Sequence, residues 1–283
     1  MTLNNQLNEN IPLISIIVAV RNGALTLQRC INSITDQSYS EKELIIIDGK
    51  SIDNTVEIIR ENDDAIAYWE SKPDKGVYHA WNKALDHANG EWICFLGADD
   101  YFWDPNVLTR ISAYLEGAYP NFRVAYGKVV LVSKVGKIIN IIGRPWQQAK
   151  KKFMQIMSIP HVGLMHHRKL FEIHGKFNEH YRIAGDYDLL LRELKTRDAL
   201  FAPDIVVAGM QYGGLGSNPK NSILILKEIA YSRKTHSVRG IAPLWHWNYL
   251  KANFANCLSI FISENNYRTA RNLYRRLTGR QPV

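Results

Sequence analysis

Two adjacent carboxylates, Asp99 and Asp100, come directly after a short apolar run. Neighbouring carboxylates repel each other unless positive charge lies close. Hard divalent cations prefer such oxygen ligands, and Mg²⁺ or Mn²⁺ is often held by one or two carboxylates together with substrate phosphates. A cation there would stabilise charge on a departing diphosphate. Paired acids can also cap a helix, but Asp104-Pro105 is already the expected start of the next one. We therefore expect Asp99 and Asp100 to bind Mn²⁺ or Mg²⁺.

Two upstream segments carry acids that suit ligand binding. Asp48 opens the stretch 48–55, and a carboxylate at a strand end can accept hydrogen bonds from a base N–H or a ribose hydroxyl. Asp-Gly is equally a common turn pair, and the absence of a GxGxxG pattern counts against a dinucleotide site. Further on, Asp74 precedes a helix that carries Asn82, and Gly76 between them would allow a ligand to approach the backbone. The alternative is that Asp74 only caps this helix.

A fourth segment places an acid at a helix start. Asp186 begins the amphipathic stretch 186–194, where the helix dipole stabilises a carboxylate that could act as a general base. An ordinary N-cap explains the residue equally well. His161 follows Pro160 and precedes an apolar run, so it can lie near the site, although a lone histidine more often has a structural role.

The elements that would position these residues alternate along the first hundred positions. Buried apolar runs predict strands at 15–20, 43–48, 65–69 and 92–96, and helical spacing predicts helices after Thr26, from residue 56, and at 76–88. Strands and helices that alternate at these lengths predict a parallel sheet with right-handed crossovers. Such sheets bind ligands at the carboxyl ends of their strands. Asp48 and the Asp99–Asp100 pair follow strand ends, where that rule places a site.

Beyond residue 100 the pattern is less regular. We expect a helix after Pro105, antiparallel strands within 124–142, a short helix at 171–174 and the helix at 186–194. Two further helices are expected at 243–262 and 267–277.

The bulk composition is that of a soluble globular protein, with 46% hydrophobic and 22% charged residues in a chain of 283. Cys30, Cys94 and Cys257 are odd in number and far apart, so we expect buried free thiols and a reducing compartment. The first ten residues lack a signal-peptide pattern, and no apolar run reaches the length of about 18 residues that suggests a spanning helix. The sequence therefore predicts a cytoplasmic protein.

The net charge of +8 is concentrated in the C-terminal part. Residues 221–283 contain ten Lys or Arg and two Glu, which predicts one domain at 1–220 and a basic helical extension at 221–283. Nucleic acid is not an expected partner, because no motif supports it. Residues 243–283 suit an anionic membrane surface. The alternative is that an apolar stripe packs on the enzyme or on a second subunit. In the second case the protein would be a homo-oligomer. The stripe consists of Trp247, Leu250, Phe254, Leu258 and Phe261.

Taken in order, the acidic segments resemble the family 2 glycosyltransferases of the GT-A fold, in particular the subgroup that builds bacterial surface polysaccharides such as O-antigens. The resemblance covers roughly residues 12–216. It rests on Ser15-Ile-Ile-Val-Ala-Val-Arg-Asn22, Asp48-Gly-Lys-Ser-Ile-Asp-Asn-Thr55, Ser71-Lys-Pro-Asp-Lys-Gly-Val-Tyr-His-Ala-Trp-Asn-Lys83, Leu96-Gly-Ala-Asp-Asp100 and Gly185-Asp186. The implied fold is α/β: a Rossmann-like, mixed but mainly parallel sheet flanked by helices, with a C-terminal helical extension.

The resemblance also implies a function. The chain would be a metal-dependent, inverting glycosyltransferase of the hexosyltransferase type, moving a sugar from a nucleoside-diphosphate sugar, with uridine as the expected nucleoside. The acceptor would be a saccharide hydroxyl. If that saccharide is linked to a polyprenyl diphosphate, the enzyme would work on the inner face of the membrane.

Site residues follow from the same resemblance. Asp186 would be the catalytic base, Asp100 would hold the metal, and Asp99 would contact the metal or the ribose. The other donor-binding positions would be Val20, Asn22, Asp48, Ser51, Asp74, Gly76 and Asn82. His161, Gly214 and Ser217 would lie towards the acceptor or in a loop, because the glycine-rich stretch 213–217 either closes over the donor or is an inert linker.

Several positions depart from the subgroup's pattern. Lys72 and His79 replace acids, Gly185 replaces the acid beside the base, and Gly97 stands where many relatives have Asp or Asn. We expect Gly97 to leave the metal site one carboxylate short. A sugar nucleotidyltransferase is the alternative enzyme, although residues 21–24 make a meagre phosphate loop. A non-catalytic protein that binds nucleotide sugars is the alternative from another class.

Overall fold

A computed structural model describes residues 12–133, 135–214, 216 and 218–261 of the chain. The strands are β1 Ile14–Val20, β2 Lys42–Asp48, β3 Tyr68–Ser71, β4 Trp92–Gly97, β5 Tyr101–Phe102, β6 Val124–Val132, β7 Ile138–Ile142, β8 Met165–His167 and β9 Leu200–Gln211. The α-helices are α1 Leu27–Thr35, α2 Thr55–Glu61, α3 Val77–Leu85, α4 Val107–Leu115, α5 Trp146–Phe153, α6 Arg168–His174, α7 Gly185–Leu194, α8 Ser222–Thr235 and α9 Pro243–Phe261. Short 3₁₀ turns lie at Asp63–Ala65 and Pro219–Asn221.

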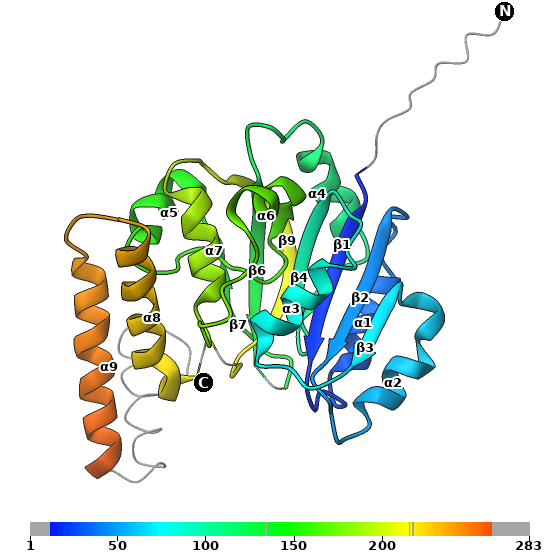
Figure 1. Cartoon of the computed structure of the whole chain (residues 1–283), viewed down its shortest axis with the longest axis horizontal. Coiled ribbons are helices and arrows are strands. Elements are labelled where there is room, and N and C mark those ends of the chain that lie inside the picture. The colour runs from blue at the N-terminus through cyan, green and yellow to red at the C-terminus, as the bar shows by residue number, and fades with distance from the viewer. Residues whose placement is uncertain (1–11, 134, 215, 217, 262–283) are drawn as a thin grey trace, which may run out of the picture.

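One mixed sheet runs through the molecule in the order β3-β2-β1-β4-β8-β6-β9-β5, with β7 paired to β6 (Figure 1). Strands β3, β2, β1 and β4 are parallel, as expected from the alternating pattern. Strand β8 is antiparallel to both β4 and β6, whereas β6 and β9 are parallel. The expected α/β architecture with a mixed sheet is confirmed.

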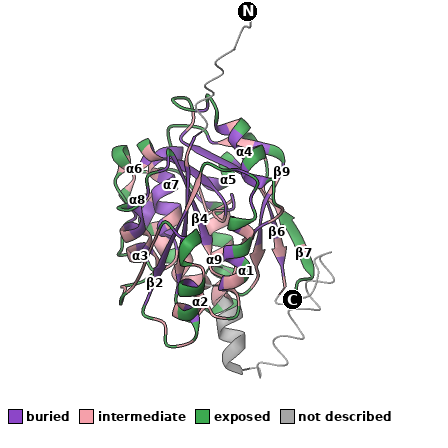
Figure 2. Cartoon of the chain, turned by 90° about the vertical axis from the view of Figure 1, so that its right-hand side faces the viewer, coloured by how far each residue is buried: buried purple, intermediate pink, exposed green. Residues whose placement is uncertain are grey.

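Helices cover both faces of this sheet, because successive side chains of a buried strand point to opposite sides. In β1, Ile16 and Val18 pack in a cluster with α1, α2 and α4, whereas Ile17 packs in a second cluster with α3, α5, α6 and α7. Buried residues accordingly fill the central strands and the inward sides of the helices, whereas β7 at the margin of the sheet is mostly exposed (Figure 2). Cys30 and Cys94 are buried free thiols, as predicted.

Several expected boundaries were wrong. The third strand is Tyr68–Ser71 instead of 65–69, and α3 is shorter than 76–88. Helix α4 begins at Val107, after a turn in which the Asp104 carboxylate accepts the N–H of Asn106. Elements α5, α8, β5, β8 and β9 have no counterpart in the prediction. The expected helix at 267–277 lies outside the described residues.

The C-terminal helices α8 and α9 lie side by side at one end of the molecule, with α8 packed against α7 (Figure 1). Ser232 of α8 is fully buried and donates to Asp188 of α7 over 3.0 Å. On α9, Trp245 packs inward and donates to the Leu226 carbonyl, whereas Trp247 is 59% exposed. The described part of the chain includes no helix that is both long and apolar enough to cross a membrane. The domain boundary after residue 220 stays a prediction.

A buried charge cluster fixes α7, the helix that begins beside Asp186. Glu193 is 1% exposed and lies between Arg123, at 3.3 Å, and His174 of α6, at 2.7 Å. Arg123 is itself buried, just before β6. Breaking a buried ion pair leaves an uncompensated charge, which costs far more than losing a surface pair.

The variant Glu193→Ala should therefore lower the free energy of unfolding by about 3–5 kcal/mol in urea denaturation, because Arg123 loses its partner. The matched control is Glu172→Ala, which removes an ion pair with Lys169 whose side chains are about half exposed; its loss should stay below about 1 kcal/mol. Equal losses in the two variants would contradict this role for Glu193.

Candidate active site

The carboxyl ends of β2, β1 and β4 meet at one edge of the sheet. Val20 pairs with Asp48, and Ala19 pairs with Gly97, so the loops after these three strands are neighbours. Asp48 also pairs with Ser71 at the end of β3. The predicted donor-binding acids therefore come together because the parallel register places them there.

Asp48 is fully buried at the end of β2. Its carboxylate accepts hydrogen bonds from the backbone and hydroxyl of Ser51 and from the Ser71 hydroxyl, at 2.5 Å for the last. Gly49 follows, and a Cβ there would overlap the Asp74 carboxylate, so the two acids lie close together. Asp74 accepts a hydrogen bond from the Gly76 N–H over 2.9 Å, and Gly76 has a positive φ of 129°.

The loop after β1 is fastened to the loop after β2 by reciprocal hydrogen bonds. The Asn22 N–H donates to the Ser51 hydroxyl over 2.7 Å, and the Asn22 side chain accepts the Ile52 N–H over 2.9 Å. Asn22 itself is left-handed, with φ 53°, a conformation that asparagine tolerates better than most residues. Val20 is buried in the core, and its carbonyl accepts the Gly49 N–H. Asn22 and Ser51 therefore form a preorganised rim, whereas Val20 supports it from below.

Asn82 has a different environment from the other predicted donor-binding residues. It is buried in α3, and its amide nitrogen donates to the Phe177 carbonyl and the Glu179 carboxylate, both at 2.9 Å. Its amide oxygen accepts the Phe177 N–H over 3.0 Å. Asn82 thus braces the segment that leads towards Asp186, and its contact with the donor stays a prediction.

Asp99 and Asp100 lie together at the end of β4. Asp100 is 6% exposed, and its oxygens accept the backbone N–H groups of Gly97 and Gln211, both at 3.1 Å. Burial, followed by the charge of Asp99, raises the pKa of Asp100 to about 7. Arg29 is the nearby cation, but its guanidinium donates to the Asp99 backbone carbonyl over 2.7 Å and lies over the Tyr101 ring.

Gly97 contributes space to this pair. A Cβ at residue 97 would lie 2.7 Å from an Asp100 oxygen and 2.9 Å from an Asp99 oxygen, closer than real Cβ atoms come. Any larger residue would displace one carboxylate or the other. The glycine that we expected to leave the site one carboxylate short is thus also what allows the two remaining acids to occupy the strand end.

The pair has the chemistry of a divalent-cation site that substrate completes. Two adjacent carboxylates, of which the buried Asp100 has a raised pKa, suit Mg²⁺ or Mn²⁺, and none of the described residues forms an ion pair with them. Among the described residues no group of three or more His, Cys, Asp or Glu side chains could hold a metal ion. Substrate phosphates would therefore have to supply further oxygen ligands.

Asp186 lies in the first turn of α7, partly buried. One oxygen, Oδ1, accepts the Tyr187 N–H over 2.8 Å and faces the Tyr78 hydroxyl at 3.4 Å, while Oδ2 accepts no hydrogen bond from the described residues. Burial raises the pKa of Asp186 to about 6. Gly185 has no room for a side chain, because a Cβ would lie 2.7 Å from the Tyr78 ring. Tyr78 thus fills the space beside Asp186 that a side chain at residue 185 would need.

His161 and the glycine-rich stretch lie near these groups. The His161 ring is 5.3 Å from that of Trp81, which is 5.5 Å from that of Tyr78, and burial lowers the pKa of His161 to about 3, so its imidazole is neutral. A Cβ on Gly214 would lie 4.0 Å from an Asp99 oxygen, so this stretch approaches the acids. Ser217 lies outside the described residues.

Two residues at this site were missed by sequence reasoning. Tyr78 lies inside one of the motifs and could have been singled out, because tyrosine in a polar motif often carries a hydrogen bond. Glu228 of α8 lies 42 positions beyond Asp186, and no local pattern connects them. Its carboxylate nevertheless accepts three backbone N–H groups just before α7.

Comparison with known proteins agrees with this geometry. Residues 15–172, more than half of the chain, match the family model described as glycosyl transferase family 2. A PGL/p-HBAD biosynthesis glycosyltransferase of Mycobacterium bovis (strain BCG / Pasteur 1173P2) is 30% identical over 214 residues, which are 73% of this chain and 80% of that protein. The chondroitin synthase of Pasteurella multocida (strain Pm70) is 29% identical over 185 residues, 64% of this chain and 19% of that one. The chain belongs to glycosyltransferase family 2.

Solved structures support the fold. The mannosyltransferase PcManGT from Pyrobaculum calidifontis, in complex with GDP-Man and Mn²⁺, superposes with a TM-score of 0.62 at 17% identity, covering 96% of this chain and 81% of that one. S. aureus TarS 1-349 in complex with UDP-GlcNAc gives 0.60 at 17% identity, covering 93% and 77%. The expected GT-A fold is confirmed.

The raised pKa of Asp186 has a consequence for stability. Its folded pKa of about 6 lies above the ordinary value of 3.8, so the charged carboxylate destabilises the fold at high pH and the penalty vanishes once the group is protonated in both states. Asp186→Asn should raise the free energy of unfolding at about pH 8 by roughly 2–3 kcal/mol. The gain should fade as the pH falls from 6 to 4, as measured by urea denaturation across this range.

Asp198 offers a control of opposite sign, because hydrogen bonds from Lys150 and Trp146 lower the pKa of its carboxyl. That group stabilises the fold above its ordinary pKa, and Asp198→Asn should lose stability at neutral pH. A gain for Asp186→Asn that does not depend on pH would rule out the desolvated charge as its cause.

Proposed function

We propose that this chain is a metal-dependent, inverting glycosyltransferase that moves a sugar from a UDP-linked donor to a saccharide hydroxyl. The observation that carries the proposal is the pairing of two acid sites within one family 2 fold: the Asp99–Asp100 pair at the carboxyl edge of the sheet, and a separate, partly buried Asp186 whose Oδ2 accepts no hydrogen bond from the described residues. Family membership favours sugar transfer over the sugar nucleotidyltransferase alternative. A non-catalytic binding protein has no use for Asp186.

Donor binding is assigned to the strand-end loops. Asp48 and Asp74, with the Asn22–Ser51 rim, would hold the base and ribose, and Asp99 with Asp100 would hold Mn²⁺ or Mg²⁺ beside the diphosphate. When bound there, the cation would neutralise charge on the departing nucleoside diphosphate. Uridine is supported by structural neighbours solved with UDP and UDP-GlcNAc, although another holds GDP-Man.

Transfer itself is assigned to Asp186. Its free Oδ2 would take the proton of the acceptor hydroxyl as that oxygen attacks the anomeric carbon. The bond between this carbon and the diphosphate oxygen breaks on the opposite face, so the anomeric configuration inverts. A carboxylate with a pKa of about 6 is ionised at neutral pH. It is also a stronger base than an ordinary aspartate, which favours proton transfer to it in the transition state.

Donor binding and transfer should separate cleanly. In a thermal-shift screen of UDP- and GDP-sugars with and without Mn²⁺, the correct donor should raise the melting temperature only with metal. Asp100→Asn should lose this shift and the transfer, whereas Asp186→Asn should keep the shift and lose the transfer by at least about 100-fold. If no nucleotide sugar stabilises the protein with Mn²⁺, the proposal fails; donor binding without transfer would favour the non-catalytic alternative.

The acceptor is proposed to be lipid-linked, with α9 resting on the inner face of a membrane. Trp247, Leu250 and Phe254 are 59%, 64% and 68% exposed, so these three do not pack on the enzyme as one alternative required. Lys251 lies over the Trp247 ring, which places a cation beside the apolar stripe. Exposed aromatic side chains next to cations suit an anionic bilayer surface.

Flotation with vesicles of phosphatidylcholine and phosphatidylglycerol tests this assignment. The wild-type protein should float at low salt, and the triple variant Trp247→Ser, Leu250→Ser, Phe254→Ser should stay at the bottom because it lacks the apolar stripe. Vesicles of phosphatidylcholine alone are the control for charge. The contrary result is that the wild-type protein does not bind the anionic vesicles and forms a dimer that the triple variant cannot form. That result would assign this face to a second subunit.

A further inference from the structure

We propose that Glu228, on α8, is a positioning residue for the catalytic base Asp186. The inference rests on the proposed function in that Asp186 is taken as the base. It extends the active machinery to a helix that lies beyond residues 15–172, the part matched by the family model, and beyond residue 220, where the composition changes.

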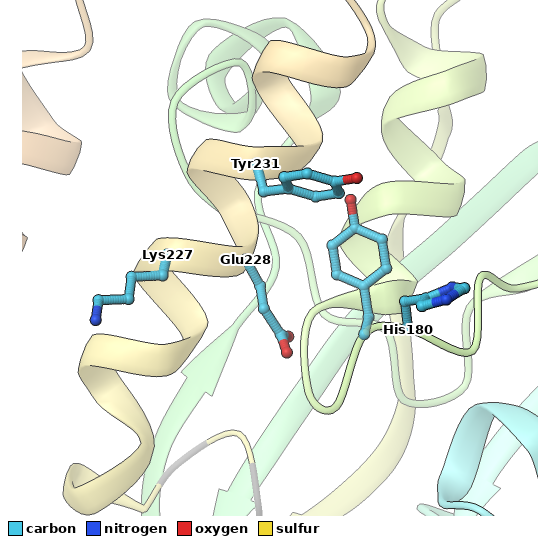
Figure 3. A pocket seen from close by; sticks show the side chains of 5 residues that line it. His180, Lys227, Glu228 and Tyr231 are labelled. Carbon is cyan, nitrogen blue, oxygen red and sulfur yellow. The ribbon is translucent and has the colours of Figure 1, made fainter.

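Glu228 holds the backbone segment that ends at the base. Its Oε1 accepts the N–H of Arg182 over 2.8 Å, and its Oε2 accepts the N–H groups of Ile183 and Ala184 at 3.0 and 2.8 Å. Figure 3 shows Glu228 extending from α8 towards the segment that carries His180. Three consecutive N–H groups bound by one carboxylate leave this segment little freedom, and Asp186 follows it by two residues.

Tyr78 of α3 holds the same segment from another side. Its hydroxyl donates to the Ile183 carbonyl over 2.5 Å, and its ring lies directly against Gly185. The peptide units of residues 182–185 are therefore bound on one side by Glu228 and packed on the other by Tyr78. The result is that Asp186 Oδ1 is turned to Tyr78 and the Tyr187 N–H, which leaves Oδ2 for a substrate.

The same two residues act in opposite directions on the charge of the base. The Tyr78 hydroxyl faces Oδ1 and lowers the pKa of Asp186, whereas the negative charge of Glu228 raises it, in addition to the larger effect of burial. Within α7, the next acid is Asp188, which is engaged elsewhere by Ser232, His236 and Arg192. Tyr78 and Glu228 are thus the titratable neighbours with opposite effects on the pKa of Asp186.

A simpler explanation is that Glu228 only caps α7, as many carboxylates do at helix starts. Glu43 provides a matched comparison, because it makes the same kind of contact far from the base. Its carboxylate accepts the N–H groups of Asn89 and Gly90 and the Ser15 hydroxyl, near the start of β2. A purely structural role predicts that Glu228→Gln and Glu43→Gln behave alike.

Variants at Glu228 should fold. Glu228 lines a pocket of about 220 Å³ together with His180, Tyr181, Lys227 and Tyr231. Removing its carboxylate therefore exposes the three N–H groups to a space that water can enter, in place of a sealed core.

The experiment compares Glu228→Gln, Glu228→Ala, Tyr78→Phe and Glu43→Gln with the wild-type enzyme. Transfer is measured as kcat against pH, and donor affinity by calorimetry. Glu228→Gln should move the acidic limb of the kcat profile to lower pH and reduce kcat about 10-fold, Glu228→Ala should reduce it towards about 100-fold, and donor Kd should change less than about 2-fold. Tyr78→Phe should move the limb to higher pH, and Glu43→Gln should not move it.

The proposal is overturned if Glu228→Gln and Glu228→Ala keep the wild-type kcat and pH profile, or if Glu43→Gln shifts the limb as Glu228→Gln does. A parallel loss of donor affinity in both Glu228 variants would also overturn it. The titration of ¹³C-labelled Asp186 by NMR gives a readout that needs no activity. If the wild-type protein transfers no sugar, the proposed function fails, while the shift of this titration in Glu228→Gln still decides whether the two carboxylates are coupled.

Discussion

The parallel pairing of β2, β1 and β4 is the constraint on which the rest of the site depends. Register fixes Asp48 beside Val20 and Gly97 beside Ala19, so loops from three distant parts of the chain leave the sheet at one edge. Because the strands are buried on both faces, a slip of one residue would turn each apolar side chain to the wrong cluster. The position of the acids is therefore secured by the core rather than by the loops themselves.

Crowding several carboxylates at that edge requires space and hydrogen-bond donors. Gly97 provides the space for Asp99 and Asp100, and backbone N–H groups of β4 and β9 bind the more buried of the two. Gly185 provides space beside Asp186, because its lack of a side chain allows the Tyr78 ring to pack against its α-carbon. Both glycines stand where the resembled motif carries a larger polar residue, Asp or Asn at 97 and an acid at 185, and in both places the glycine allows a closer approach of its neighbours.

The sequence predicts this architecture well where local pattern and tertiary role coincide. Buried apolar runs correctly placed β1, β2 and β4, because a strand buried on both faces has a distinctive composition, and acids follow β2 and β4 at Asp48 and at the Asp99–Asp100 pair. The pattern is silent where a residue acts across a long separation. Glu228 lies in an unremarkable polar position of α8, and only the packing of α8 on α7 brings it to residues 182–184. On α9, the same spacing rule could not tell that Trp245 packs inward while Trp247 stays exposed.

The two halves of the site differ in how the protein maintains them. At the proposed donor site, Asp48 accepts hydrogen bonds from Ser51 and Ser71, so that end is stabilised by its own hydrogen bonds. Asp186, the proposed base, is held in a partly buried place that disfavours its charge, and this burial raises its pKa. Such a group keeps its geometry only if neighbouring elements hold the backbone around it, since the carboxylate itself gains little from being there. Tyr78 of α3 and Glu228 of α8 make such contacts with residues 182–185, so the start of α7 is held by elements from two distant parts of the chain.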